Sequence, residues 1–146
     1  MSVKVDLRIT PCRFEDVVLF SNQAKRERSI IEDSHHTQWY LAEVRMIDPD
    51  AAPGDYAETY SKAGCGALMR MRGNEGRIKG TFVAPGFRGL GISKQLNDKC
   101  LMAAMLAHCS SVTAFVTIER NLKWYIQNGF RVLSKRGSIA FVKRIL

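Results

Sequence analysis

This chain of 146 residues lacks any long hydrophobic run. None of its apolar segments approaches the roughly 18 residues that a membrane-spanning helix requires, which excludes a membrane protein of the helical kind. The first eight residues alternate apolar and polar side chains and contain no apolar core like that of a secretion signal. From these absences we expect a soluble, cytoplasmic protein with no membrane partner.

Cysteine is sparse as well. The four cysteines are far apart and form no Cys-x-x-Cys pair: Cys12, Cys65, Cys100 and Cys109. This spacing excludes a zinc ribbon and a disulfide framework. The adjacent His35 and His36 have no third ligand at a metal-binding spacing, so we predict no metal site.

Acidic side chains are few. The sequence has 14 aspartates and glutamates against 22 lysines and arginines, which gives a net charge of +8. Such an excess indicates an anionic partner: a nucleic acid, an acidic substrate, or a cofactor that carries several phosphate charges. Because the basic residues are dispersed and form no basic tail, charge alone leaves these three partners open.

Four of the acids lie in one irregular segment, residues 47–64. It contains Asp48, Asp50, Asp55 and Glu58, and no base precedes Lys62. This predicts a long acidic loop, and loops of that length are often functional. Two interpretations stay open: a solvated loop, or a lid or docking surface for a cationic amine.

Strand and helix patterns alternate along the rest of the chain, which predicts an α/β protein with one domain over residues 1–146. We predict strands at 3–9, 38–46, 65–72, 77–83, 112–116, 130–134 and 139–144. We predict helices at 10–28, from about 91 onward, and at 120–128, while residues 29–37 fit a short helix or a loop. The first of these helices is predicted to begin at Thr10 as its N-cap, with Pro11 in its first turn.

Residues 80–93 organise the chain: a strand enters a Pro/Gly turn that leads directly into a helix beginning near Gly91. The first N–H groups of a helix have no intrahelical acceptor, and the helix dipole adds positive charge there. Glycine lets the backbone approach a ligand closely because it has no Cβ. The stretch therefore predicts a phosphate or pyrophosphate site.

The sequence Val83-x-Pro-x-x-Arg-Gly-x-Gly-Ile92 resembles motif A of the GNAT superfamily of N-acetyltransferases. Ser93 stands where the family has another small residue. The resemblance implies a GNAT-like mixed central sheet of about six to seven strands flanked by three to four helices. It also implies that acetyl-coenzyme A is the co-substrate. Its pyrophosphate would lie at the turn, on these residues: Arg88, Gly89, Gly91, Ile92, Ser93 and Lys94.

A second stretch, Tyr125-x-x-x-Gly-Phe130, is similar to the family's C-terminal motif. The resemblance implies that Tyr125 protonates the departing thiolate of coenzyme A, a task that suits a phenol because it is neutral at pH 7. A core aromatic is the other interpretation of Tyr125. The asparagine that the family has seven residues earlier is replaced by Ile118, and Asn121 is close but out of register.

The resemblance further implies that backbone N–H groups near Phe82 and Val83 bind the pantetheine arm and polarise the thioester carbonyl. A family glutamate that deprotonates the amine is missing from residues 77–83. Glu43, His35 and His36 are the remaining candidates for a general base, and the sequence favours none of them.

The sequence thus predicts an acetyl-coenzyme A-dependent N-acetyltransferase that acts directly on a primary amine of a small molecule or protein. Two alternatives stay open. One is a protein of this fold that binds or modifies nucleic acid, as the charge of +8 would suit. The other is a degenerate family member that binds an acyl-coenzyme A and regulates a partner. The C-terminal hairpin is expected to supply an edge strand that can pair in a homodimer.

Overall fold

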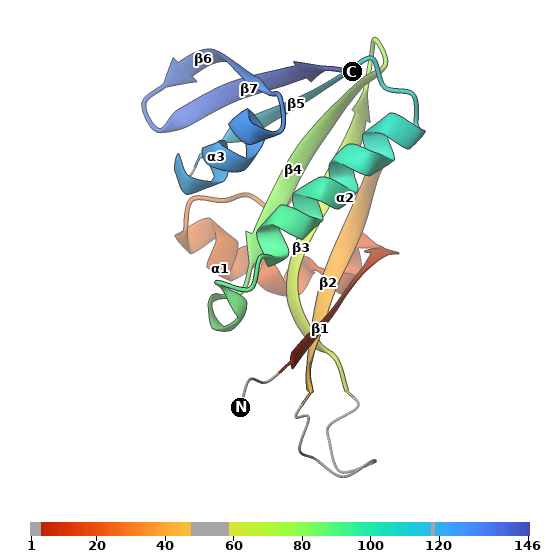
Figure 1. Cartoon of the computed structure of the whole chain (residues 1–146), viewed down its shortest axis with the longest axis vertical. Coiled ribbons are helices and arrows are strands. Elements are labelled where there is room, and N and C mark those ends of the chain that lie inside the picture. The colour runs from red at the N-terminus through yellow and green to blue at the C-terminus, as the bar shows by residue number, and fades with distance from the viewer. Residues whose placement is uncertain (1–3, 48–58, 118) are drawn as a thin grey trace.

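The computed structural model describes residues 4–47, 59–117 and 119–146. Within these ranges seven strands form one mixed sheet in the order β1-β2-β3-β4-β5-β7-β6 (Figure 1). The strands are β1 (Lys4–Cys12), β2 (Thr37–Ile47), β3 (Ser61–Met71), β4 (Glu75–Val83), β5 (Ser111–Val116), β6 (Arg131–Arg136) and β7 (Ile139–Ile145). The helices are α1 (Ser21–Arg26), α2 (Ile92–Leu106) and α3 (Glu119–Gln127). The predicted fold class is confirmed.

Helices cover both faces of the sheet. Figure 1 shows α2 and α3 on the near face and α1 behind the strands. The near-face core contains Ile92, Leu96 and Cys100 of α2, as their spacing of four predicts for one helix face. A smaller core lies on the α1 side, where Phe20 packs against Phe82 of β4 with ring centroids 5.8 Å apart.

The prediction of a helix from Thr10 was wrong. Thr10 and Pro11 continue β1 and pair with Leu41 and Tyr40 of β2. Proline is tolerated there because β1 is an edge strand, where a missing N–H removes no bond to a second neighbour. The expected long helix is instead two short 3-10 turns, Phe14–Asp16 and Val18–Phe20, followed by α1. Residues 29–36 contain no helix.

The predicted loop at 47–64 ends earlier than expected, because β3 already begins at Ser61, where it pairs with Val44 of β2. Residues 48–58, with the four acids of that loop, lie outside the described residues. The prediction of an edge strand in the C-terminal hairpin is confirmed: β7 pairs with β5, and β6 lies at the end of the sheet. Pairing of β6 across a dimer stays a prediction. No helix in the described ranges is long and apolar enough to cross a membrane.

Two irregularities of β4 shape the site. Gly80 and Thr81 together lie opposite the single residue Gly66 of β3, which forms a β-bulge. Gly80 has a φ of 66°, and a Cβ there would lie 2.8 Å from two ring carbons of Trp39, so only glycine fits. Past Arg77 the parallel pairing of β4 with β5 stops, and the two strands separate (Figure 1).

Candidate functional site

The turn between β4 and α2 has the geometry that the sequence predicted. A 3-10 turn, Pro85–Phe87, follows β4, and α2 begins at Ile92. Gly89 and Gly91 have φ values of 85° and 75°, which an L side chain rarely adopts. Gly91 is the N-cap residue and forms no side-chain cap. The first N–H groups of α2 therefore have no acceptor in the helix and can bind an anion.

The space in front of this turn is open, and the first turn of α2 adds no carboxylate to it. A Cβ at Gly89 or Gly91 would meet no atom within 4 Å. The first turn of α2 contains no acid, and Lys94 lies exposed at its start. The local potential therefore favours a negatively charged ligand.

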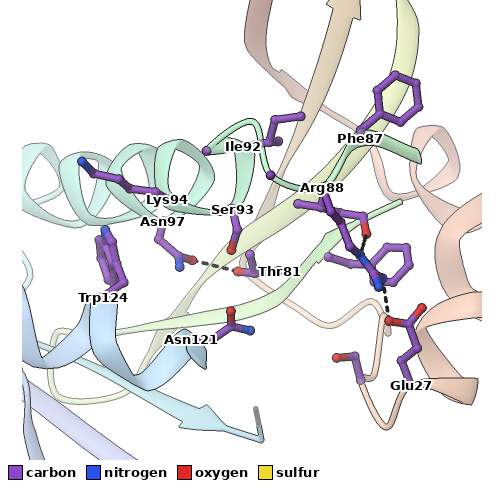
Figure 2. Close-up of a pocket in the computed structure, with 15 residues that line it drawn as sticks. Glu27, Thr81, Phe87, Arg88, Ile92, Ser93, Lys94, Asn97, Asn121 and Trp124 are labelled. Carbon is purple, nitrogen blue, oxygen red and sulfur yellow. Dashed lines mark hydrogen bonds and ion pairs between the residues drawn. The ribbon is translucent and has the colours of Figure 1, made fainter. Parts of the chain in front are cut away.

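The turn forms one wall of a cavity of about 340 Å³, which we call the turn cavity. All eight residues that the sequence assigned to cofactor binding line it: Phe82, Val83, Arg88, Gly89, Gly91, Ile92, Ser93 and Lys94. Residues from the end of β4, from the turn and from the start of α2 therefore line the same cavity. Figure 2 shows how Ser93 and Lys94 of α2 and Arg88 of the turn lie around it.

The side chain of Arg88 is bound at the rim of the turn cavity. Its Nε donates to the carbonyl oxygen of Val83 at 3.0 Å, and its Nη2 donates to Glu27 Oε1 at 2.5 Å (Figure 2). Its Cζ lies 5.7 Å from the centroid of the Phe82 ring. These contacts join the turn to β4 and to the end of α1. Its guanidinium is therefore shared with a carboxylate before any anion arrives.

Three polar residues that the sequence did not assign to the site also line this cavity: Thr81, Asn97 and Asn121. Thr81 Oγ1 donates to Asn97 Oδ1 at 2.9 Å, although Asn97 is only 2% exposed (Figure 2). Asn121 of α3 lines the same space. The register of Asn121 differs from that of the family asparagine, yet the fold brings it to the cavity. One feature of the sequence indicated a role for Asn97: it is a polar residue directly after Leu96, on the apolar side of α2.

A second cavity of about 330 Å³, which we call the cleft cavity, lies where β4 and β5 separate. It is lined by Arg28, Ser29, Ile30, Glu32, Met69, Arg77, Ile78, Lys79, Gly80, Thr81, Asn97, Phe115, Val116, Thr117, Asn121 and Tyr125. Four of these residues also line the turn cavity: Ser29, Thr81, Asn97 and Asn121. The two cavities therefore adjoin, and a long ligand in one can reach the other.

Tyr125 lines the cleft cavity and also packs in the near-face core. It is 5% exposed, and its ring lies edge-on to Trp124 and Phe130, with centroids 4.9 and 5.1 Å away. Burial, and to a smaller extent the nearby Cys100, raises the pKa of Tyr125 well above its usual 10.0. The phenol is therefore protonated at neutral pH and can act as a proton donor.

The three residues considered as general bases lie elsewhere. Glu43 forms an ion pair with Arg8 at 3.0 Å, and neither Glu43, His35 nor His36 lines a cavity. Glu32 is the carboxylate of the described residues that lines the cleft cavity. In the part of the chain that the structure describes, no group of histidines, cysteines and acids could hold a metal ion.

Comparison with known proteins identifies the family of this arrangement. A family model described as an acetyltransferase (GNAT) domain matches residues 54–132, more than half of the chain. That range includes β4, the glycine turn, α2, β5 and α3. No curated protein sequence matches this chain.

Solved structures share the fold over nearly the whole chain. A GNAT-family acetyltransferase from Staphylococcus aureus MU50 is 19% identical, with a TM-score of 0.70, over 97% of this chain and 99% of that one. One from Elizabethkingia anophelis with acetyl-CoA bound is 16% identical, with a TM-score of 0.65, over 96% and 98%. A Mycobacterium tuberculosis protein in complex with CoA is 16% identical, with a TM-score of 0.68, over 95% and 99%.

Proposed function

Because this chain belongs to the GNAT family of acetyltransferases, we propose that it transfers the acetyl group of acetyl-coenzyme A directly to a primary amine. One observation carries the proposal. The eight residues assigned to the cofactor line one cavity, and that cavity adjoins a second one that contains Tyr125. Relatives of the same fold with acetyl-CoA or CoA bound support this choice of co-substrate.

The glycine turn is assigned to the pyrophosphate. N–H groups of the first turn of α2, together with those of Gly89 and Gly91, donate to the phosphate oxygens. The open space where a Cβ would stand at either glycine fits a ligand that approaches the backbone closely. Lys94 adds a positive charge at the mouth. Arg88 acts mainly by fixing the turn through its bonds to Val83 and Glu27.

The free side of β4 is assigned to the pantetheine arm. Beyond Arg77 this side no longer pairs with β5, so an extended chain can add to it as a strand would. The N–H group of Val83 then donates to the thioester oxygen as it gains negative charge. The N–H group of Phe82 points toward β3 instead, as does that of Ala84, which donates to the carbonyl oxygen of Ala63 at 2.8 Å. The side chains of Asn97 and Asn121 offer further hydrogen bonds on the facing helices.

Tyr125 is assigned as the general acid. Its position in the cleft cavity and its raised pKa suit a group that keeps its proton until a thiolate departs. We assign no described side chain as the general base. The acceptor amine then loses its proton to water, directly or through a short chain of water molecules.

The experiment is an acceptor screen with purified protein and acetyl-coenzyme A, with release of the free thiol as the readout. We expect turnover with at least one primary amine and a lower kcat for Tyr125→Phe. Cofactor binding without turnover of any amine would instead favour the degenerate, regulatory family member.

A further inference from the structure

The cleft cavity is unusually basic for a space that is to receive an amine. Of the described residues that line it, Arg28, Arg77 and Lys79 are cations and Glu32 is the one carboxylate. An alkylammonium ion would be repelled by this surplus, whereas an anionic oxygen would be attracted. The charge of the lining residues therefore indicates which kind of acceptor the cleft cavity can bind.

Lys79 is the first of these three cations. Its Nζ donates to the carbonyl oxygen of Glu32 at 2.9 Å and to Ser34 Oγ at 2.7 Å, both neutral acceptors. Burial lowers the pKa of Lys79, against the opposing influence of Asp33 and Glu32. These two hydrogen bonds use two of its three ammonium protons, so one more acceptor can bind, and an anion would best offset the cost of burial.

Arg77 is held rigidly two residues earlier on the same face of β4. Its Nε donates to Thr113 Oγ1 at 3.2 Å, and its Cζ lies 4.8 Å from the centroid of the Phe115 ring. Glu75 lies 3.9 Å from Arg77 but also 4.0 Å from Lys143, so this carboxylate is shared between two cations. A fixed guanidinium of this kind suits a planar carboxylate or a phosphate.

The third cation comes from the loop after α1. Arg28 has a φ of 63°, a left-handed conformation that costs a residue with a Cβ about 1–2 kcal/mol. The conformation is stabilised by a hydrogen bond from its N–H to the carbonyl oxygen of Lys25 at 3.2 Å. The loop thus adds a positive charge to the lining of the cleft cavity from a segment other than β4.

We propose that the cleft cavity takes an amine acceptor that also carries an anionic oxygen group, a carboxylate or a phosphate, held by Lys79, Arg77 and Arg28. This assignment rests on the proposed acetyl transfer. Apolar side chains beside the cations, among them Met69 and Phe115, bind the carbon skeleton between the anionic group and the amine. The amine itself faces the junction with the turn cavity, near Tyr125.

The test compares acceptors that differ in the anionic group. One pair of arms uses L-phenylalanine and L-phenylalaninamide, and a second uses O-phosphoethanolamine and ethanolamine. We measure kcat/KM with acetyl-coenzyme A, and binding of each compound by calorimetry. We expect the anionic member of one pair to be favoured about 10- to 100-fold, as for a hydrogen bond to a charged group. The pair that shows the preference identifies a carboxylate or a phosphate.

Two variants locate the effect. Lys79→Gln should remove most of this preference and leave coenzyme A binding unchanged. Lys62→Gln removes the same charge from a lysine that lines neither cavity, and it should preserve the preference. The proposal is overturned if neither pair shows a preference, or if Lys79→Gln weakens coenzyme A instead. Failure of the acetyl transfer would appear separately, as an absence of turnover with every acceptor, and the calorimetric arm would still test binding of the anion.

Discussion

Gly91 and Gly73 form a matched pair that separates folding from cofactor binding. Their φ values are 75° and 74°, and a Cβ at either position would meet no atom within 4 Å. Gly91 is the N-cap of α2 at the turn cavity, whereas Gly73 lies in the β3–β4 hairpin turn and lines neither cavity. Alanine at either position therefore causes the same backbone strain, but only Gly91→Ala puts a methyl group where we place the pyrophosphate.

The folding cost follows from the left-handed backbone. Alanine in this conformation costs about 1–2 kcal/mol. Loss of conformational entropy in the unfolded chain offsets about 0.4–1 kcal/mol of that. The net loss is about 1 kcal/mol for each variant, and this lowers Tm by roughly 2–4 °C in a chain of this size. Urea and thermal unfolding should therefore give nearly equal values for the two proteins.

The binding cost should differ between them. In Gly91→Ala the methyl group keeps the phosphates from the N–H groups, and the loss of one charge-assisted hydrogen bond weakens coenzyme A by about 10- to 100-fold. Gly73→Ala should bind as the unaltered protein does. The assay is calorimetric titration of both variants. Equal affinities for coenzyme A in the two variants would refute the assignment of the turn.

Four further predictions concern β4, the general acid and the rim of the turn cavity. Gly80→Ala should lower the free energy of unfolding by about 2–5 kcal/mol in urea unfolding, because left-handed backbone strain and overlap with the Trp39 ring add together. A loss below about 1 kcal/mol would contradict the described backbone geometry of Gly80. kcat/KM should rise about tenfold per pH unit below the pKa of the acceptor amine, because only the neutral amine attacks. It should not fall before about pH 10, because the raised pKa keeps Tyr125 protonated. A decrease of kcat/KM near pH 8 would exclude Tyr125 as the general acid. Above pH 10 the unfolded tyrosine ionises while Tyr125 keeps its proton, so the free energy of unfolding should decrease with rising pH in a pH titration of stability. Glu27→Gln should strengthen coenzyme A binding several-fold in calorimetry, because it removes a negative charge that lines the turn cavity while a glutamine oxygen can still accept the bond from Arg88. The change in stability should stay below about 1 kcal/mol because the ion pair is partly exposed, and a weakened affinity would contradict this prediction.

Local chemistry explains why residues 80–93 could be predicted. Positive φ at Gly89 and Gly91 and a helix start at Ile92 depend on the residues in the turn itself. The signal at Thr10 and Pro11 was also local, but there the pairing of β1 with β2 overrode the helix-capping preference. This strand could not be predicted from residues 10 and 11 alone, because its partner β2 is distant in the sequence.

The cavities themselves could not be predicted from the sequence, because they depend on contacts between distant segments. The cleft exists because β4 leaves β5 after Arg77, and the hydrogen bond between Thr81 and Asn97 joins a strand to a helix 16 residues away. The sequence placed Asn121 in a predicted helix, but it did not show that this residue lines both cavities. A nucleic-acid partner, suggested by the charge of +8, and a homodimer through β6 both stay predictions.

The central claim is that the turn cavity holds acetyl-coenzyme A, and calorimetric titration of acetyl-coenzyme A and coenzyme A into the purified chain tests it most directly. We predict one site per chain with a Kd of about 1 μM, which corresponds to about −8 kcal/mol. The absence of binding heat for both ligands, confirmed by the lack of any shift in Tm at millimolar ligand, would contradict the claim. Residues 80–93 would then be a structural turn without a ligand.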